Sequence, residues 1–322
     1  MPKVSVIIPA LNCDKYIGNC LNHLFAQSYP IEKTEIIIVD NGSTDNTESI
    51  IDNYPVKKLK CLKKGPAAAR NLGIKNSHGE ILIFIDSDCL ADKNLIKNHV
   101  QAHLKFRKSD PRVKIIGGGI KGYNQNLWSL CDDFCSWSLF HFNLTPRFEH
   151  RLCPTANMSI DRDILNTVGV FDEDLFFGED YTFCNKALKH DFLIYFEPQA
   201  FTQHINRTTF HEFIHHAKNW AEADLDLYRL DVLKLKKRFS HFVFYYFIFF
   251  FCLNLQPIYS GLLARRFYVI FLSPFIFINR SYIWFIRVNI HRRERKRAKT
   301  GKLNLSKNST AIPEKEIMLS VD

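Results

Sequence analysis

The sequence contains no CxxC pair, and its nine cysteines, an odd number, are spread from Cys13 to Cys252. In a chain of 322 residues this pattern excludes a disulfide framework and predicts reduced thiols in a cytosolic compartment. We also expect no cleavable signal peptide. The first residues, MPKVSVIIPALN, enter a strand-like apolar run that is too short for the hydrophobic region of a signal with its flanks.

Internal repeats and long low-complexity linkers are absent from the sequence as well. Apolar residues make up 46% of the chain, which is enough for one sizeable domain with an appendage. We therefore expect a single main domain rather than an array of repeats.

The positive charge is not accompanied by any nucleic-acid-binding motif. Much of the net charge of +10 falls after residue 230, in the clusters 234–238, 265–266 and 291–299. These clusters flank the most apolar part of the chain. This arrangement is typical of contact with an anionic membrane surface, and it argues against a nucleic-acid partner.

The first ninety residues alternate between β-branched runs and helical patterns. Strands are predicted at 4–10, 35–40 and 80–86, with a weaker one at 56–62, and helices at 15–27, 47–54 and 66–77. Continuous apolar strands separated by helices indicate a parallel sheet that is covered on both faces. Because ligands bind at the carboxyl ends of such strands, Asn12, Asp40 and Asp86 should meet at one edge of the sheet.

The stretch FIDSD raises a specific question, because two carboxylates directly follow the buried strand pattern ILIFI. An isolated charge is very costly to bury. Asp86 and Asp88 must therefore lie in water at the mouth of a crevice or hold a positive group.

After residue 207 the pattern changes. We expect an amphipathic helical connector at 208–239, a membrane-associated or transmembrane helical pair at 240–290 and a basic, disordered tail at 291–322. The apolar runs 241–259 and 267–286 have 19 and 20 residues, about the length that a spanning helix needs. They fit a spanning hairpin or two helices lying in the interface. A buried helix pair of a soluble protein is the alternative.

Five segments in order, VSVIIPALN, IIIVDNGSTDNT, GPAAARNLGI, FIDSD and GED, together resemble the family 2 glycosyltransferases. The resemblance covers about residues 3 to 205. It implies an inverting enzyme with the A-type nucleotide-sugar-binding fold, an α/β, Rossmann-like mixed sheet flanked by helices. A catalytic domain at 1–207 would then carry the C-terminal apolar, membrane-associated helical segment.

Asp86-Ser87-Asp88 matches the DxD motif of that family. The resemblance implies a divalent ion, Mn²⁺ or Mg²⁺, which prefers carboxylate oxygens and neutralises the diphosphate of the donor. Asp88 is assigned to the metal, and Asp86 is assigned mainly to the donor with a share in the metal. His204 completes the metal shell in some relatives of this fold. The alternatives are that Asp88 caps a following helix and that His204 is structural.

The resemblance also implies a donor site. Asp40 would accept from the uracil ring or the ribose, and Arg70 would contact the base or the diphosphate, unless it forms a surface salt bridge. A UDP-sugar is the favoured donor. Asn41 stands where the family often has aspartate, and this departure leaves the choice between UDP, GDP and another nucleotide open. The residues assigned to the nucleotide sugar are Pro9, Ala10, Asn12, Asp40, Arg70, Asp86, Ser87 and Asn157.

Glu179-Asp180 matches the family's ED motif. An inverting transfer is a single in-line displacement, so a general base must take the proton of the acceptor hydroxyl. We assign Asp180 as that base and Glu179 as its supporting neighbour. The alternative is a helix N-terminus carrying acids because of the helix dipole.

Two rival classes remain at this point. A nucleotidyltransferase shares the nucleotide half of the fold, but it usually has a Gly-rich loop with Arg and Lys after the first strand, where this chain has PALNCDKYIG. A catalytically dead, membrane-bound nucleotide-sugar-binding protein would have lost Asp88 or Asp180. Residues 203–207 do not match the QxxRW motif of processive members, so we expect addition of one sugar.

We therefore predict an inverting, metal-dependent glycosyltransferase anchored by its C-terminal segment to the cytoplasmic face of the cell membrane. Its partners would be a nucleotide-diphosphate sugar, the membrane surface and a hydroxyl acceptor. The acceptor would be a lipid-linked saccharide or another envelope glycan precursor, because an enzyme held at a surface meets lipid acceptors there.

Overall fold

The computed structural model describes residues 1–175, 177–218, 258–259, 262, 271–278 and 282. The strands are β1 (Val4–Ala10), β2 (Thr34–Asp40), β3 (Lys57–Lys60), β4 (Ile81–Ile85), β5 (Cys89–Ala91), β6 (Val113–Gly122), β7 (Arg147–Glu149), β8 (Asn157–Asp161) and β9 (Leu193–His204). The helices are α1 (Ile17–Phe25), α2 (Thr47–Ile51), α3 (Pro66–Lys75), α4 (Leu95–Ser109), α5 (Leu127–Trp137), α6 (Leu165–Val168) and α7 (Glu179–Lys189).

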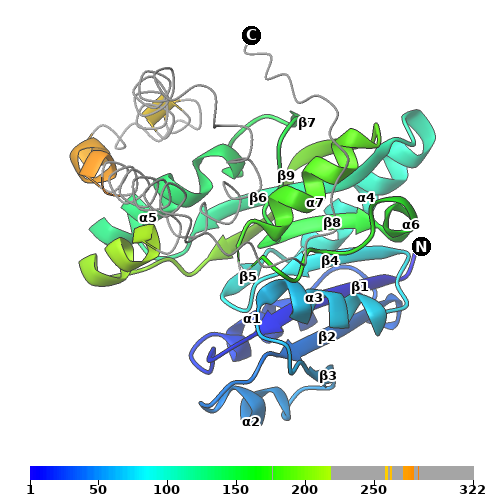
Figure 1. Ribbon diagram of the computed structural model, residues 1–322, viewed down its shortest axis with the longest axis horizontal. Coiled ribbons are helices and arrows are strands. Elements are labelled where there is room, and N and C mark those ends of the chain that lie inside the picture. Colours follow the sequence, from blue (N-terminus) through cyan, green and yellow to red (C-terminus); the bar gives the residue numbers. More distant parts are fainter. Residues whose placement is uncertain (176, 219–257, 260–261, 263–270, 279–281, 283–322) are drawn as a thin grey trace, which may run out of the picture.

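The strands form one mixed sheet in the order β3-β2-β1-β4-β8-β6-β9-β5, with β7 paired to β9 (Figure 1). The first four strands are parallel, as their apolar runs predict. The parallel pattern ends at β8, which lies antiparallel to both β4 and β6. The predicted α/β mixed sheet flanked by helices is therefore confirmed, whereas a sheet with only parallel strands would be wrong.

Side chains of successive strand residues alternate between two apolar layers. Ile83 of β4 packs with Ile17 of α1 and Val100 of α4, which cover one face of the sheet. Phe84, the next residue, packs with Phe183 of α7 on the opposite face. Both faces of the central strands are thus buried, which explains why their sequences are continuously apolar.

A ladder of polar side chains joins α4 to β8. Residues four apart on the helix meet alternate residues of the strand on one face. The pairs are His99 with Asn157 (2.9 Å), His103 with Ser159 (2.8 Å) and Arg107 with Asp161 (2.6 Å). Burial lowers the pKa of His99 to about 4, so its ring is neutral and both ring nitrogens are used in hydrogen bonds within the ladder.

The described part of the C-terminal region packs against α5. Leu272 and Ile276, in the helical stretch 271–278, contact the cluster around Phe134 and Phe213. Most of the two predicted apolar runs lies outside the described residues. Among the helices that can be described, none combines the length and the apolarity needed to cross a membrane.

Candidate active site

The loops after β1 and β2 are locked together at the carboxyl edge of the sheet. Ala10 and Asp40 are register partners at the ends of these strands, with Pro9 one residue earlier. Asn12 follows with a positive φ of 48°, a conformation that asparagine tolerates better than most residues. Its side-chain oxygen accepts from the backbone N–H of Thr44 at 2.8 Å. The structure thus brings these predicted donor-site residues side by side.

Asn41 connects this edge to the loop before α3. Its side-chain nitrogen donates to the carbonyls of Lys63 (2.7 Å) and Cys61 (3.3 Å), and its side-chain oxygen accepts from the N–H of Gly65 (2.8 Å). An aspartate lacks the two N–H donors. The asparagine therefore serves to hold the 61–65 loop, which explains the departure from the aspartate that is common at this position.

Arg70 bridges the two acidic motifs. One guanidinium nitrogen donates to Asp86 at 2.7 Å and another donates to Glu179 at 2.6 Å. Arg70 is only 4% exposed, so it is neither a surface salt bridge nor free to reach a base or a diphosphate with its bonded nitrogens. We assign Arg70 to the alignment of the acids rather than to direct nucleotide recognition. The link joins the end of β4 to the start of α7.

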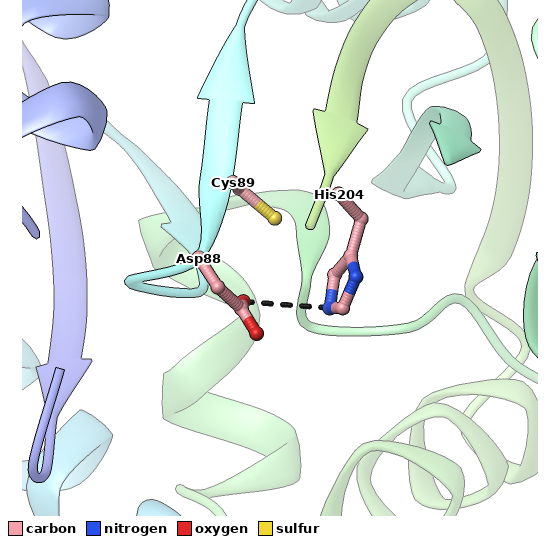
Figure 2. Close-up of side chains that lie close together, drawn as sticks. All are labelled: Asp88, Cys89 and His204. Atoms are coloured by element: carbon pink, nitrogen blue, oxygen red, sulfur yellow. Dashed lines mark ion pairs between the residues drawn. The ribbon is translucent and has the colours of Figure 1, made fainter. Parts of the chain in front are cut away.

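Asp88 directly precedes β5, so it does not cap a helix. Strand β5 pairs with the end of β9, and this pairing brings His204 to the acid (Figure 2). The Nε2 atom of His204 lies 3.4 Å from Oδ1 of Asp88. Asp86 stands two residues earlier and is partly exposed, with Ser87 between them.

Asp88, Cys89 and His204 each offer a ligand atom, and these atoms lie within 4.8 Å of one another. The carboxylate oxygen suits Mn²⁺ and Mg²⁺, and the imidazole nitrogen beside it favours the transition metal Mn²⁺ of the two, with Asp86 close by in sequence. Burial raises the pKa of the Cys89 thiol well above its ordinary value, and the thiol is 3.5 Å from the carbonyl of Ala156. A protonated thiol is a poor ligand for these cations, so the fitting donors of this cluster are Asp88 and His204. Asp86 is predicted to share the cation from the DxD motif, and one of its oxygens is bonded to Arg70.

Asp180 occupies the first turn of α7, next to Glu179. Its carboxylate accepts from the backbone N–H of Tyr181 at 2.7 Å. Loss of surrounding water, followed by the negative charge of Glu179, raises the pKa of Asp180 to about 7. A carboxylate tuned to this range can accept a proton at neutral pH. Glu179 does not share this role, because it is paired with Arg70.

Asn157 lies inside the sheet. It is fully buried, and its side-chain nitrogen donates to the carbonyls of Gly119 (2.9 Å) and Ala200 (2.8 Å). Its oxygen faces His99. Since protein groups use the whole amide, we assign Asn157 to the packing of β8 between its neighbours and not to contact with a donor.

Sequence reasoning missed two residues near the metal-ligand set, Asn206 and Trp137. The side-chain oxygen of Asn206 lies 2.9 Å from Nδ1 of His204 and 3.2 Å from the indole nitrogen of Trp137. The H-x-N spacing at the end of β9 is the one sequence signal for Asn206. Trp137 comes from α5, 69 residues away, and has no such signal.

Comparison with known proteins agrees with this architecture. Residues 5–169 match the model of "Glycosyl transferase family 2". A Methanococcus voltae protein, named as a dolichyl N-acetyl-alpha-D-glucosaminyl phosphate 3-beta-D-2,3-diacetamido-2,3-dideoxy-beta-D-glucuronosyltransferase, is 27% identical over 68% of this chain and 72% of its own. Glycosyltransferase AglE of Haloferax volcanii is 28% identical over 74% of this chain and 79% of its own.

Among solved structures, the mannosyltransferase PcManGT of Pyrobaculum calidifontis, in complex with GDP-Man and Mn²⁺, has a similar fold. The TM-score is 0.55 at 17% identity, covering 94% of this chain and 81% of the other. The matched residues include the DxD motif and most of the sheet from β1 to β8, whereas the ED motif and β9 lie beyond their end. These matches leave the nucleotidyltransferase alternative without support, and the chain belongs to glycosyl transferase family 2.

Proposed function

We propose that this glycosyltransferase moves one sugar from a nucleotide-diphosphate sugar, with a UDP-sugar favoured, to a hydroxyl acceptor by a single inverting displacement. The observation that carries the proposal is the Arg70 bridge, because it ties the DxD acid Asp86 to the ED acid Glu179 across the site. The donor-binding and proton-accepting motifs are thereby held at one edge of the sheet.

On the donor side, the ends of β1 and β2 supply Pro9, Ala10, Asn12 and Asp40 for the nucleotide. Asp88, Asp86 and His204 would hold Mn²⁺ or Mg²⁺. The bound cation would neutralise the charge of the departing diphosphate.

On the acceptor side, Asp180 takes the proton of the attacking hydroxyl. The hydroxyl oxygen forms a bond to the anomeric carbon while the bond from that carbon to the diphosphate oxygen breaks, so the anomeric configuration inverts. The raised pKa of Asp180, which results from its buried surroundings and Glu179, makes it a competent base near pH 7. Glu179 pairs with Arg70, and this contact holds the start of α7, which carries the base, in place.

We further propose a lipid-linked acceptor at the cytoplasmic face of a membrane. The similar Methanococcus voltae protein is named for a dolichyl-phosphate-linked sugar acceptor. In this chain, the basic clusters 234–238, 265–266 and 291–299 flank apolar runs. Positive charge beside apolar segments favours contact with anionic lipid headgroups.

A donor screen tests the function. Detergent-purified full-length protein is incubated with UDP-, GDP- and dTDP-sugars, with and without Mn²⁺, and release of the nucleotide is measured. We expect metal-dependent turnover of one donor, and a loss of at least about 100-fold in Asp88→Asn, because a catalytic cation contributes several kcal/mol to charge stabilisation.

The matched control for that screen is Asp163→Asn, an acid on the surface at the opposite end of β8 whose carboxylate pairs with Lys114. It should turn over the donor like the wild type. If no donor shows metal-dependent binding, the assignment of FIDSD to a metal site is wrong, and the catalytically dead alternative takes its place.

Sedimentation with anionic phosphatidylserine vesicles tests the membrane contact. Phe271 is 82% exposed and Phe277 lies on the same helical stretch. Changing both to glutamate should weaken binding by at least about 10-fold, because burial of one such side chain contributes roughly 1.5–3 kcal/mol. The control is Leu62→Glu, an equally apolar and 96% exposed site on the nucleotide half of the sheet. Equal binding by all three proteins would refute this surface.

A further inference from the structure

The two ring nitrogens of His204 face different partners. Nε2 points to Asp88 at 3.4 Å, and Nδ1 lies 2.9 Å from the side-chain oxygen of Asn206. A neutral imidazole carries one N–H and one lone pair, and only the nitrogen with the lone pair can bind a cation. The partner of Nδ1 therefore decides whether Nε2 is available.

The orientation of the Asn206 amide is determined by two groups of α5. The indole Nε1–H of Trp137 can only donate, and it lies 3.2 Å from one amide atom. The carbonyl oxygen of Ser129 can only accept, and it lies 3.1 Å from the other. The first atom must be oxygen and the second must be nitrogen, because the reversed amide would lose both bonds. Asn206 is buried, so water does not offer substitutes.

This orientation fixes the proton on His204. Since Oδ1 of Asn206 accepts, Nδ1 of His204 must carry the hydrogen, and Nε2 must carry the lone pair. We propose that Asn206, oriented by Trp137 and Ser129, is a positioning residue that holds His204 in the tautomer whose Nε2 binds the divalent cation beside Asp88. The inference rests on the metal-dependent function proposed above.

The neighbouring residues leave room for the Asn206 amide and restrict the orientation of the His204 ring. Gly122 of β6 is the register partner of His204. A Cβ at Gly122 would come within 2.6 Å of the side-chain nitrogen of Asn206, so the absence of a side chain there makes space for the amide. The Trp137 ring lies 4.9 Å from the His204 ring, centroid to centroid, and limits its rotation. Both contacts help to hold the side chains of Asn206 and His204 in this arrangement.

The first test measures Mn²⁺ binding instead of turnover. Free Mn²⁺ is followed by electron paramagnetic resonance in the presence of the full-length protein, with and without UDP or GDP. Asn206→Leu should raise the Kd for Mn²⁺ by about 10- to 100-fold, the usual effect of losing a residue that orients a metal-binding histidine. Asn206→Asp keeps an acceptor for both donors, so it should retain affinity within a few-fold even though it loses the bond to Ser129.

Asn98→Leu is the matched control, because Asn98 also ties an element to β9, through the carbonyl of Gln199, but far from the ligands. Its Mn²⁺ affinity should equal that of the wild type. If Asn206→Leu does not fold, Trp137→Phe keeps an aromatic ring next to His204 and removes the N–H donor with the rest of the indole, and it should still weaken Mn²⁺ binding. Wild-type affinity in folded Asn206→Leu would overturn the inference.

The second test reads the tautomer directly in metal-free protein. Nitrogen-15 spectra of histidine-labelled protein at pH 8, with His204 assigned by its loss in His204→Ala, should show a protonated Nδ1 and an unprotonated Nε2. A protonated Nε2 would overturn the inference. If the wild type has the expected tautomer but binds no Mn²⁺ under any condition, the proposed metal-dependent function fails while the orientation by Asn206 stands.

Discussion

Replacing Asp180 with asparagine should lower the rate of sugar transfer by about 10²- to 10⁴-fold, because an amide cannot take the proton from the acceptor hydroxyl. Donor binding should change little, since the residues that we propose for the nucleotide lie at the ends of β1 and β2 and in the DxD segment. The same comparison is made across pH 5 to 9. The pKa of Asp180 is raised to about 7 by its buried surroundings and by Glu179. Below that pH the base is protonated, so the wild-type kcat/KM should fall about tenfold per pH unit.

Asp174→Asn provides the control for Asp180→Asn. Asp174 is an acid of the loop before α7, but it is 84% exposed and faces Lys63 instead of the site. Its transfer rate and the fall of its kcat/KM at low pH should match those of the wild type. Another group must be the base if Asp180→Asn keeps more than one tenth of the wild-type transfer rate, or if its kcat/KM falls at low pH as it does in the wild type.

Replacing Arg70 with methionine should destabilise the fold and abolish transfer together. Methionine has a similar length and is accommodated by apolar surroundings, but it leaves the carboxylates of Asp86 and Glu179 without their common cation. Removing one partner of a buried ion pair costs about 3–5 kcal/mol. We expect that loss in the free energy of unfolding, measured by urea denaturation followed by circular dichroism.

Two further variants separate charge from packing at Arg70. Adding Glu179→Gln to Arg70→Met removes one of the two unpaired charges and should restore part of the stability, although transfer stays low. Arg112→Met serves as the control, because Arg112 is 61% exposed and pairs with Asp110 at the surface. Such a pair contributes roughly 0–1 kcal/mol. Equal stability losses in Arg70→Met and Arg112→Met would contradict the bridging role.

The nucleotide half of the fold could be predicted because its signals are local. Each of β1, β2 and β4 is a continuous apolar run with a polar residue at its carboxyl end, and parallel strands bring those ends together. The position of Asn12, Asp40 and Asp86 at one edge follows from this rule alone. The helices between the strands were predicted within a few residues of their observed ends.

What could not be predicted depends on pairs that are distant in the sequence. Arg70 meets Glu179 across 109 residues, and nothing near Arg70 distinguishes that bridge from a nucleotide contact. Asn157 was assigned to the donor from its neighbours, whereas the insertion of β8 between β4 and β6 buries it.

The polar ladder between α4 and β8 determines where the helix can sit along the strand. An interface of leucine and valine would pack almost as well after the helix slid by one turn, about 5.4 Å. Here that slide would bring Pro111 to the level of Asp161 and take away the guanidinium of Arg107. A buried group left unbonded costs about 1–3 kcal/mol, and more when it is charged. The ladder thus fixes the register of α4 along β8. A substitution at one of these helix positions would need a compensating substitution at its partner on the strand.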